Sequence, residues 1–291
     1  MKIDYYCFPC FFKQSIIAGN LAKVDDNIRL KLIKETAKLI NDIDITKSPA
    51  HFTTFLHRRI REIIGRDPFE DIKREYNAIS LNLYEELKSI INNSKNSLNT
   101  AYRLAISGNI IDFGIFTHID IHETIQNTLS GSLTIDRSQE LTEALMSNQK
   151  VMYLLDNTGE IVFDRVFIEL LIEIGKEVTV VVKGSNIIND ATMSDAIDTG
   201  ITNICRVIDN GSDCVGTILE WTSPDFQKEF NEAKLIISKG QGNFETLHDH
   251  NDKKKDIFFL FKSKCKPLSK ILKATKGGSF IAHSKKDYIY L

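Results

Sequence analysis

Three short stretches of the sequence combine carboxylate, amide and lysine side chains with glycines. They are Asp156-Asn157-Thr158-Gly159-Glu160, Lys183-Gly184-Ser185 with Asn189-Asp190 shortly after it, and Ser238-Lys239-Gly240-Gln241-Gly242-Asn243. Carboxylate and amide oxygens are ligands that suit Mg²⁺ or Mn²⁺. Glycines let backbone N–H groups approach an anion closely, and a lysine adds a positive charge. The residue types therefore favour a site for a divalent cation and a phosphate group.

Each of the three stretches follows a run of apolar, mostly β-branched residues. Such runs predict strands at 151–155, 178–182, 204–208, 235–237 and 257–261, with helical segments near 162–175, 191–199, 216–220 and 225–232. Strands that are apolar on both faces and separated by helix-length connections indicate a parallel sheet covered by helices. Because parallel sheets bind ligands outside the carboxyl ends of their strands, we expect the three stretches to meet at one edge. The segments 279–283 and 288–290 are interpreted as edge strands.

The first half of the chain has a different pattern. From about residue 12 to residue 147, apolar residues recur at spacings of two to four, which is typical of amphipathic helices. We therefore predict an α/β protein, with a helical subdomain over 1–147 that packs on the sheet edge. The second part, 148–291, is predicted to be a Rossmann-like α/β/α sandwich that has a mostly parallel sheet and carries the metal and phosphate site.

The composition narrows the possible functions. The chain has 291 residues, 42% of them hydrophobic, and a formal net charge of −2. This excludes a disordered chain, and no apolar run approaches the roughly 20 residues that span a bilayer. A slightly acidic protein shows no basic footprint for nucleic acid. Five cysteines, an odd number, and no secretory signal pattern at the start predict a cytoplasmic protein with reduced thiols.

Each stretch taken alone is also typical of a turn, because Asp, Asn and Gly are common turn residues. The third stretch matches neither a Walker A loop nor a dinucleotide fingerprint. Turns do not require an acid, a second acid and a lysine at successive strand ends. The combination therefore favours a site over three unrelated turns.

The same stretches resemble the motifs of the DUF89 family, the metal-dependent damage-control phosphatases. The matching segments are 155–164, 183–192 and 238–247, and in the helical part 67–69 with Lys73 and Asn77, and 106–114. Cys7, Cys10 and Lys264-Cys265 match the cysteine-containing archaeal and bacterial subgroup. The similarity follows the order of the chain over nearly its whole length.

The resemblance implies one divalent metal, ligated by Asp156, Asn157 and Asp190. It implies catalytic roles for Asp156, Asp190 and Lys239, and it places the substrate phosphate against Lys239 and Gly240. The remaining candidates for the phosphate-binding cavity are Lys183, Gly184, Asn243, Asn109 and Asp112. The metal is open between Mg²⁺, Mn²⁺, Ni²⁺ and Co²⁺, and no organic cofactor is expected.

The function expected from these residues is hydrolysis of phosphate monoesters of small sugar or damaged metabolites. Phosphoryl transfer gathers negative charge on nonbridging oxygens, which a metal and a lysine would stabilise. Whether Asp156 attacks phosphorus or only holds the metal stays open. Two alternatives remain: a carboxyl methyltransferase that uses S-adenosylmethionine, and a non-catalytic sensor that binds a sugar phosphate. Against the methyltransferase, no Gly-rich nucleotide turn of the usual kind follows the first strand.

Three cysteines stand apart from this chemistry. Cys7 and Cys10 form half of a zinc or redox signature, and Cys265 could be a third ligand. A closed zinc site needs four ligands, and the sequence offers no evident fourth. A structural metal or thiol cluster and ordinary buried thiols are both open at this point.

Overall fold

The computed structural model describes residues 1–109, 121–250, 252–274 and 277–287, and its centre is a seven-stranded sheet. The strands are β1 (Ile135–Asp136), β2 (Lys150–Leu154), β3 (Glu177–Val182), β4 (Arg206–Asp209), β5 (Leu235–Lys239), β6 (Asp256–Lys262) and β7 (Ser279–His283). They lie in the order β1-β7-β6-β5-β2-β3-β4. All neighbouring pairs are parallel except β6 and β7. The predicted α/β fold with a mostly parallel sheet is confirmed.

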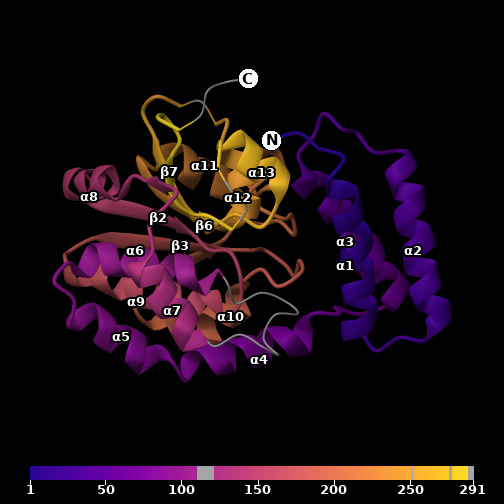
Figure 1. The fold of residues 1–291 in the computed structure, drawn as a ribbon, viewed down its shortest axis with the longest axis horizontal. Helices are drawn as coiled ribbons and strands as arrows, with labels where there is room; N and C mark the ends of the chain where they lie inside the picture. Colours follow the sequence, from indigo (N-terminus) through magenta and orange to yellow (C-terminus); the bar gives the residue numbers. More distant parts are fainter. Residues whose placement is uncertain (110–120, 251, 275–276, 288–291) are drawn as a thin grey trace.

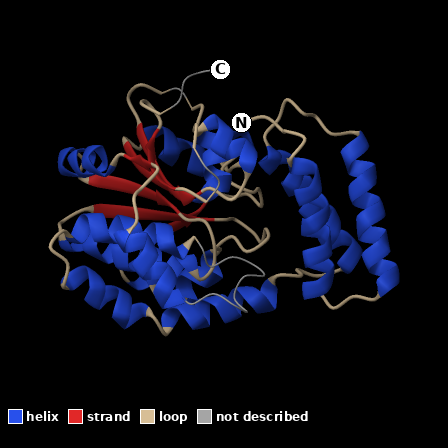
Figure 2. Ribbon diagram, viewed as in Figure 1, coloured by secondary structure: helices blue, strands red, loops and turns tan. Residues whose placement is uncertain are grey.

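Helices cover both faces of this sheet (Figure 2). One face packs against α4 (Glu70–Leu81), α5 (Tyr84–Asn92), α6 (Ser97–Gly108), α7 (Ile121–Ser130), α8 (Ser138–Ser147), α9 (Glu160–Glu173) and α10 (Met193–Asp198). The other face packs against α11 (Pro224–Glu232), α12 (Gly240–Leu247) and α13 (Lys266–Ile271). Alternate strand residues enter the two cores, as side chains of a strand must. None of the helices in the described part of the chain is long and apolar enough to cross a bilayer.

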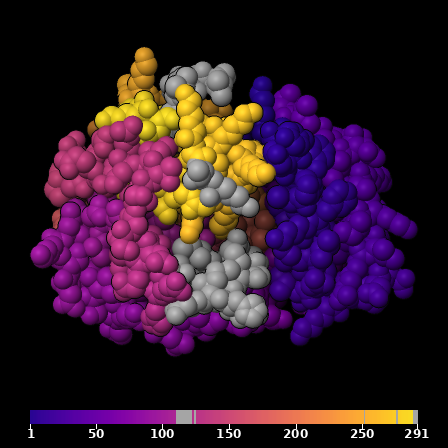
Figure 3. Space-filling view, viewed as in Figure 1, coloured from indigo at the N-terminus to yellow at the C-terminus, as the bar shows by residue number. Residues whose placement is uncertain are grey.

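The first three helices form a lobe beside the sheet (Figure 1). They are α1 (Cys7–Leu21), α2 (Asp26–Asn41) and α3 (Pro49–Ile64), and they share a core around Phe11, Phe52 and Leu56. Figure 3 shows the surface of this lobe, in indigo and violet, against the yellow C-terminal part of the chain. The helices α4 to α10 belong instead to the layer that covers one face of the sheet. Their hydrophobic core runs across the boundary that we expected at residue 147, and β1 is itself part of the sheet.

Some elements differ from the sequence-based expectation. The helices α12 and α13 were not predicted. Two of the first three residues of α12 are glycines, which are poor helix formers. The segment 216–220 forms no α-helix, and only a 3₁₀ turn, Leu219–Trp221, lies there. The strand 279–283 is not at the edge, because β1 pairs with its outer side. The segment 288–290 lies outside the described residues.

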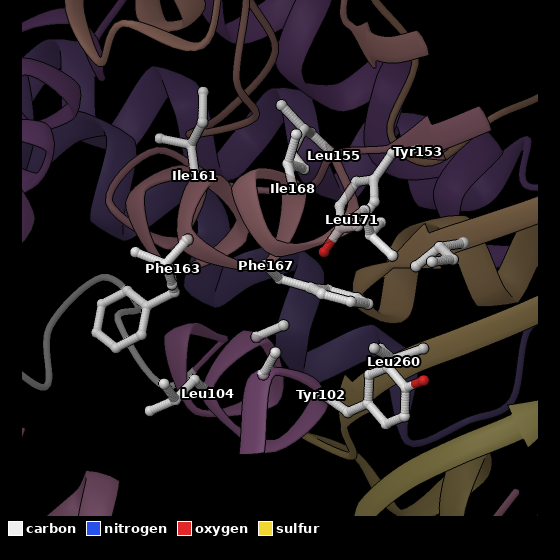
Figure 4. Close-up of a cluster of buried hydrophobic side chains, with 14 of the residues drawn as sticks. Tyr102, Leu104, Tyr153, Leu155, Ile161, Phe163, Phe167, Ile168, Leu171 and Leu260 are labelled. Carbon is white, nitrogen blue, oxygen red and sulfur yellow. The ribbon is translucent and has the colours of Figure 1, made fainter. Parts of the chain in front are cut away.

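The core on the α6–α9 side is centred on aromatic contacts (Figure 4). The Phe167 ring of α9 meets the rings of Tyr102 and Tyr153 edge-on, with centroids 5.2 and 5.8 Å away. All three side chains are fully buried. Edge-to-face contacts of this kind add to the free energy gained by burial. This cluster therefore fixes α9, whose first turn carries residues of the candidate site.

We expect Phe167→Ala to lower the free energy of unfolding by about 3–5 kcal/mol, because it opens a cavity among close-packed rings. Urea unfolding followed by circular dichroism measures the loss. Met146→Ala on α8 is the control, since Met146 is 62% exposed and should change stability by no more than about 0.5 kcal/mol. A loss below about 1 kcal/mol for Phe167→Ala would show that the cluster does not anchor α9.

Candidate functional site

The candidate site lies where the order of the strands reverses. β2 is followed along the chain by its neighbour β3, and after β4 the chain returns to β5 on the other side of β2. In open α/β sheets, ligands bind at such a switch point, outside the carboxyl ends of the strands. The three polar stretches singled out in the sequence follow β2, β3 and β5, which are adjacent in the sheet. The fold therefore brings their backbones to one edge.

Backbone pairing joins the loops that follow β2 and β3. The N–H of Ala191 donates to the carbonyl oxygen of Asp156, and the N–H of Thr158 donates to that of Asn189, each at 2.8 Å. Asn157 and Asp190 form an isolated antiparallel bridge, whose Cα atoms are typically about 5 Å apart. Asp156, Asn157 and Asp190 all line one cavity of about 350 Å³. The three residues expected to ligate a metal thus lie together.

The donor set fits a hard divalent cation. Asp190 Oδ2 is buried without a hydrogen-bond partner among the described residues, and the nearest ammonium, that of Lys183, is 3.4 Å away. Asn157 Nδ2 donates to Asp156 Oδ2 at 2.6 Å and to Glu160 Oε2 at 3.2 Å, which leaves the amide oxygen for another partner. Carboxylate and amide oxygens are the ligands that Mg²⁺ and Mn²⁺ prefer.

Electrostatics at the site point the same way. Burial raises the pKa of Asp156 well above its usual value, and the charges of Glu160 and Asp190 raise it further. Burial also raises the pKa of Asp190, although the Lys183 ammonium opposes the shift. Buried carboxylates stay ionised only when positive charge compensates them. A cation among these oxygens would therefore stabilise the ionised form of the site.

Gly240 lets the Asp156 carboxylate sit against the start of α12. A Cβ atom at Gly240 would lie 1.9 Å from Asp156 Oδ2, and the residue has a φ of +80°. Both the contact and the backbone conformation require glycine. In the structure Gly240 makes room for Asp156, and its contact with the substrate phosphate stays a prediction.

Lys239 is placed differently from the expectation that it binds the substrate phosphate. Its side chain is fully buried and does not line the cavity; the ammonium donates to Glu160 Oε1 at 2.6 Å, Asp164 Oδ1 at 2.7 Å and the Ala105 carbonyl oxygen at 2.8 Å. Burial alone would lower the pKa of Lys239, but the two carboxylates outweigh it and raise the pKa. Alternation explains the direction, because Leu235 and Ile237 of β5 face the same α6–α9 core.

The buried ion-pair cluster of Lys239, Glu160 and Asp164 is joined by hydrogen bonds to the residues of the candidate metal site. Glu160 Oε2 accepts hydrogen bonds from Asn157 at 3.2 Å and from Asn109 at 2.9 Å, and Asn109 also donates to Asp156 Oδ2 at 3.2 Å. Glu160 and Asp164 lie in the stretch 155–164 singled out from the sequence, but no role in the site was predicted for either. Their i, i+4 spacing on one face of α9 was the available signal.

The other residues expected at the phosphate have protein partners in the structure. Lys183 donates to the Gly216 carbonyl oxygen. Gly184 packs so closely on the backbone of Gly211 and Ser212 that a Cβ atom would lie 2.6 Å from it. Both groups of the Asn243 amide are used, by the carbonyls of Leu155 and Lys239 and by the Thr217 hydroxyl. None of the three lines the cavity. Asp112 lies outside the described residues.

A lysine that was not predicted faces the cavity. Lys264 follows β6 and lines the cavity together with Gln241 and Gly242 of α12. Its charge lowers the pKa of Asp156, which shows that the two groups are close enough to interact. Its position in the sequence could have indicated this, because Lys264 follows the end of β6, the strand next to β5 in the sheet. In the sequence, Lys264 was noted only as part of the Lys264-Cys265 match to the cysteine-containing subgroup.

The three cysteines line the same cavity, on the side of the N-terminal lobe. Cys7, Cys10 and Cys265 are free thiols, and burial raises the pKa of Cys7 and of Cys265 to about 11. Within the described ranges, no group of three or more His, Cys, Asp or Glu side chains is arranged to hold a metal ion. In the part of the chain that the structure describes, these three residues are therefore free thiols outside any three-ligand group, and a role for them as a metal or thiol cluster stays a prediction.

Comparisons with known proteins agree with the fold and the motifs. Residues 3–279 match the family model described as the damage-control phosphatase ARMT1-like domain. A damage-control phosphatase of Pyrococcus horikoshii is 35% identical over 98% of this chain and 99% of its own length. A damage-control phosphatase of Archaeoglobus fulgidus is 30% identical, covering 95% and 97%. The crystal structure of a DUF89 family protein from Pyrococcus horikoshii superposes with a TM-score of 0.86 at 34% identity, over 98% of this chain and all of that one.

The chain therefore belongs to the ARMT1-like (DUF89) family of damage-control phosphatases, as its motifs indicated.

Gly240→Ala should disrupt the site, because the added methyl group collides with the Asp156 carboxylate. Gly65→Ala is a matched control: Gly65 has a φ of +81° and nothing within 4 Å of the added atom. Both variants carry a backbone cost of about 1–2 kcal/mol, which unfolding experiments would show. Only Gly240→Ala should lose the stabilisation that Mn²⁺ gives the folded protein in a thermal melt. Equal Mn²⁺ responses in the two variants would contradict this description of the site.

Proposed function

We propose that this chain is a metal-dependent phosphatase that hydrolyses phosphate monoesters of small metabolites, either sugar phosphates or damaged metabolites. The observation that carries the proposal is the buried Oδ2 of Asp190, which accepts no hydrogen bond among the described residues and has the Lys183 ammonium 3.4 Å away. It lies beside Asp156 and Asn157, at a cavity that Lys264 also lines. Relatives over the full length of the chain are named damage-control phosphatases. The donor set and the family support the same chemistry.

The residues that would hold the metal are Asp156, Asn157 and Asp190. When bound, a divalent cation supplies Lewis-acid stabilisation for charge on the phosphoryl oxygens. Asn109 and Glu160 hold the Asp156 and Asn157 side chains in place through hydrogen bonds. This support matters because a stabilising group that is already in place costs no reorganisation when the reaction occurs.

The rest of the cavity would bind the ester. Lys13 and Lys264 both line the cavity, and Lys264, which is half-buried and acts on the pKa of Asp156, is the one placed to bind phosphate oxygens. Phe11 and Cys7 of α1 and Phe69 before α4 form part of the opposite wall. A volume of about 350 Å³ is at the small end of ligand pockets. The size favours a small metabolite over a polymer or a phosphoprotein segment.

The direct test is metal-dependent release of phosphate from p-nitrophenyl phosphate, followed by a panel of sugar phosphates. We expect activity with Mn²⁺ or Mg²⁺ that chelation abolishes, and a loss of about 100-fold or more in Asp156→Asn and in Asp190→Asn. Asp198→Asn, at an exposed position of α10, should retain wild-type activity.

Three outcomes would contradict the proposal. Full activity of both variants would remove Asp156 and Asp190 from the mechanism. Tight binding of sugar phosphates without release of inorganic phosphate would indicate a sensor, and methyl transfer would indicate a methyltransferase.

Lys264→Met should lower kcat/KM for the same ester by about tenfold or more, because it removes the lysine that faces the phosphate. Lys270→Met is the control, since Lys270 is exposed on the neighbouring helix α13. Steady-state kinetics over a range of substrate concentrations separates KM from kcat. Unchanged kinetics in Lys264→Met would show that the phosphate is bound elsewhere.

A further inference from the structure

Helix α4 sends two buried side chains, Lys73 and Asn77, toward the loops that carry the candidate metal ligands. They meet Asp195, at the start of α10, and the three residues are each 4% exposed. None of them lines the cavity. They therefore have no direct contact with a substrate, and their effect on the site has to pass through other residues.

One arm of this cluster reaches the loop after β2. Asn77 Oδ1 accepts a hydrogen bond from the Gly159 N–H at 2.8 Å, and Asn77 Nδ2 donates to Asp195 Oδ1 at 2.9 Å. Gly159 has a φ of +75° and directly precedes α9. Gly159 stands two residues after Asn157. Its hydrogen bond to Asn77 therefore fixes the backbone between the Asp156-Asn157 pair and the start of α9.

The other arm reaches the loop after β3. Asp195 Oδ2 accepts from the Thr192 N–H at 2.8 Å and from the Thr192 hydroxyl at 2.7 Å. Lys73 Nζ lies 3.0 Å from the same oxygen and donates to Asn186 Oδ1 at 3.3 Å. Asn186 and Thr192 bracket Asp190 along the chain, so both ends of its loop are held.

We propose that Asn77, Asp195 and Lys73 act as positioning residues that set the spacing of the two ligand-bearing loops and thereby the affinity for the metal. The inference rests on the proposed function, in which Asp156, Asn157 and Asp190 hold a divalent cation. Partners behind the ligands of a metal site commonly change metal affinity by 10- to 100-fold when they are removed. The backbone bonds between the loops join their middle parts, whereas this cluster fixes their outer ends.

The chemistry of the cluster permits a reciprocal exchange as its test. Asn77→Asp keeps an acceptor for the Gly159 N–H but brings a second carboxylate against Asp195. Asp195→Asn can keep its amide oxygen for the Thr192 N–H, the Thr192 hydroxyl and the Lys73 ammonium, but its Nδ2 then faces Asn77 Nδ2, a donor against a donor. The double variant Asn77→Asp/Asp195→Asn moves the negative charge from position 195 to position 77. The amide at 195 then donates to the carboxylate at 77, so the hydrogen bond between the two side chains is restored with its direction reversed. Ser80→Ala is the control, a buried position on α4 whose hydroxyl has no partner among the described residues.

The readout is the dissociation constant of Mn²⁺ without substrate, measured by calorimetry below the unfolding transition of each variant. We expect each single variant to weaken Mn²⁺ binding by about tenfold or more. The double variant should recover to within about threefold of wild type, and Ser80→Ala should be unchanged. Single variants that fold and bind Mn²⁺ as wild type does, or a double variant no better than the worse single, would overturn the proposal.

Hydrogen exchange of the metal-free protein tests the same contacts without Mn²⁺. Amides of 157–160 and 186–192 should exchange about tenfold faster or more in each single variant, and the double variant should restore their protection. If Asn77→Asp does not fold, Asn77→Ala takes its place as the single variant. Wild-type protein that binds no Mn²⁺ would refute the proposed function alone, and exchange rates unchanged in the single variants would refute the positioning role.

Discussion

The structure depends on an excess of buried negative charge at one edge of the sheet. Asp156, Glu160, Asp164 and Asp190 are buried there, and the buried ammonium groups among them are those of Lys183 and Lys239. When all four carboxyl groups are ionised, two negative charges remain beyond these two ammonium groups. The half-buried Lys264 offsets part of this excess, and a divalent cation can neutralise the rest. Burying such charges without compensation costs several kcal/mol, so the site requires either protons or a cation.

The fold supplies the rigidity that this arrangement needs. The aromatic contacts of Phe167 hold α9, and α9 presents Glu160 and Asp164 to Lys239. Glu160 in turn holds Asn109 and Asn157 beside Asp156. Helix α4 ties the loops after β2 and β3 together from outside, while the N-terminal lobe forms the opposite wall of the cavity. Each layer therefore positions the next, from hydrophobic core to ligand-bearing loops.

Much of this could be predicted from the sequence, because the rules involved are local. Apolar strands separated by helices predicted the parallel sheet, and the strand-end rule brought Asp156, Asn157 and Asp190 together. The direction of Lys239 was missed because it depends on strand parity, which the alternation of Leu235 and Ile237 encodes. The place of Lys264 after a strand end is visible in the sequence, but its position at the cavity is a long-range feature. It depends on how the chain after β6 lies against α12, where the Lys264 N–H donates to Gln241 Oε1 at 3.0 Å. The same holds for the contact of Asn77 with Asp195, 118 residues apart.

The most direct test of the central claim is a crystal of this protein grown with MnCl₂ and measured for anomalous scattering. The account predicts a strong anomalous peak among the carboxylate oxygens of Asp156 and Asp190 and the amide oxygen of Asn157. A fully occupied peak elsewhere, such as at Cys7, Cys10 and Cys265, or no peak at saturating Mn²⁺, would contradict it.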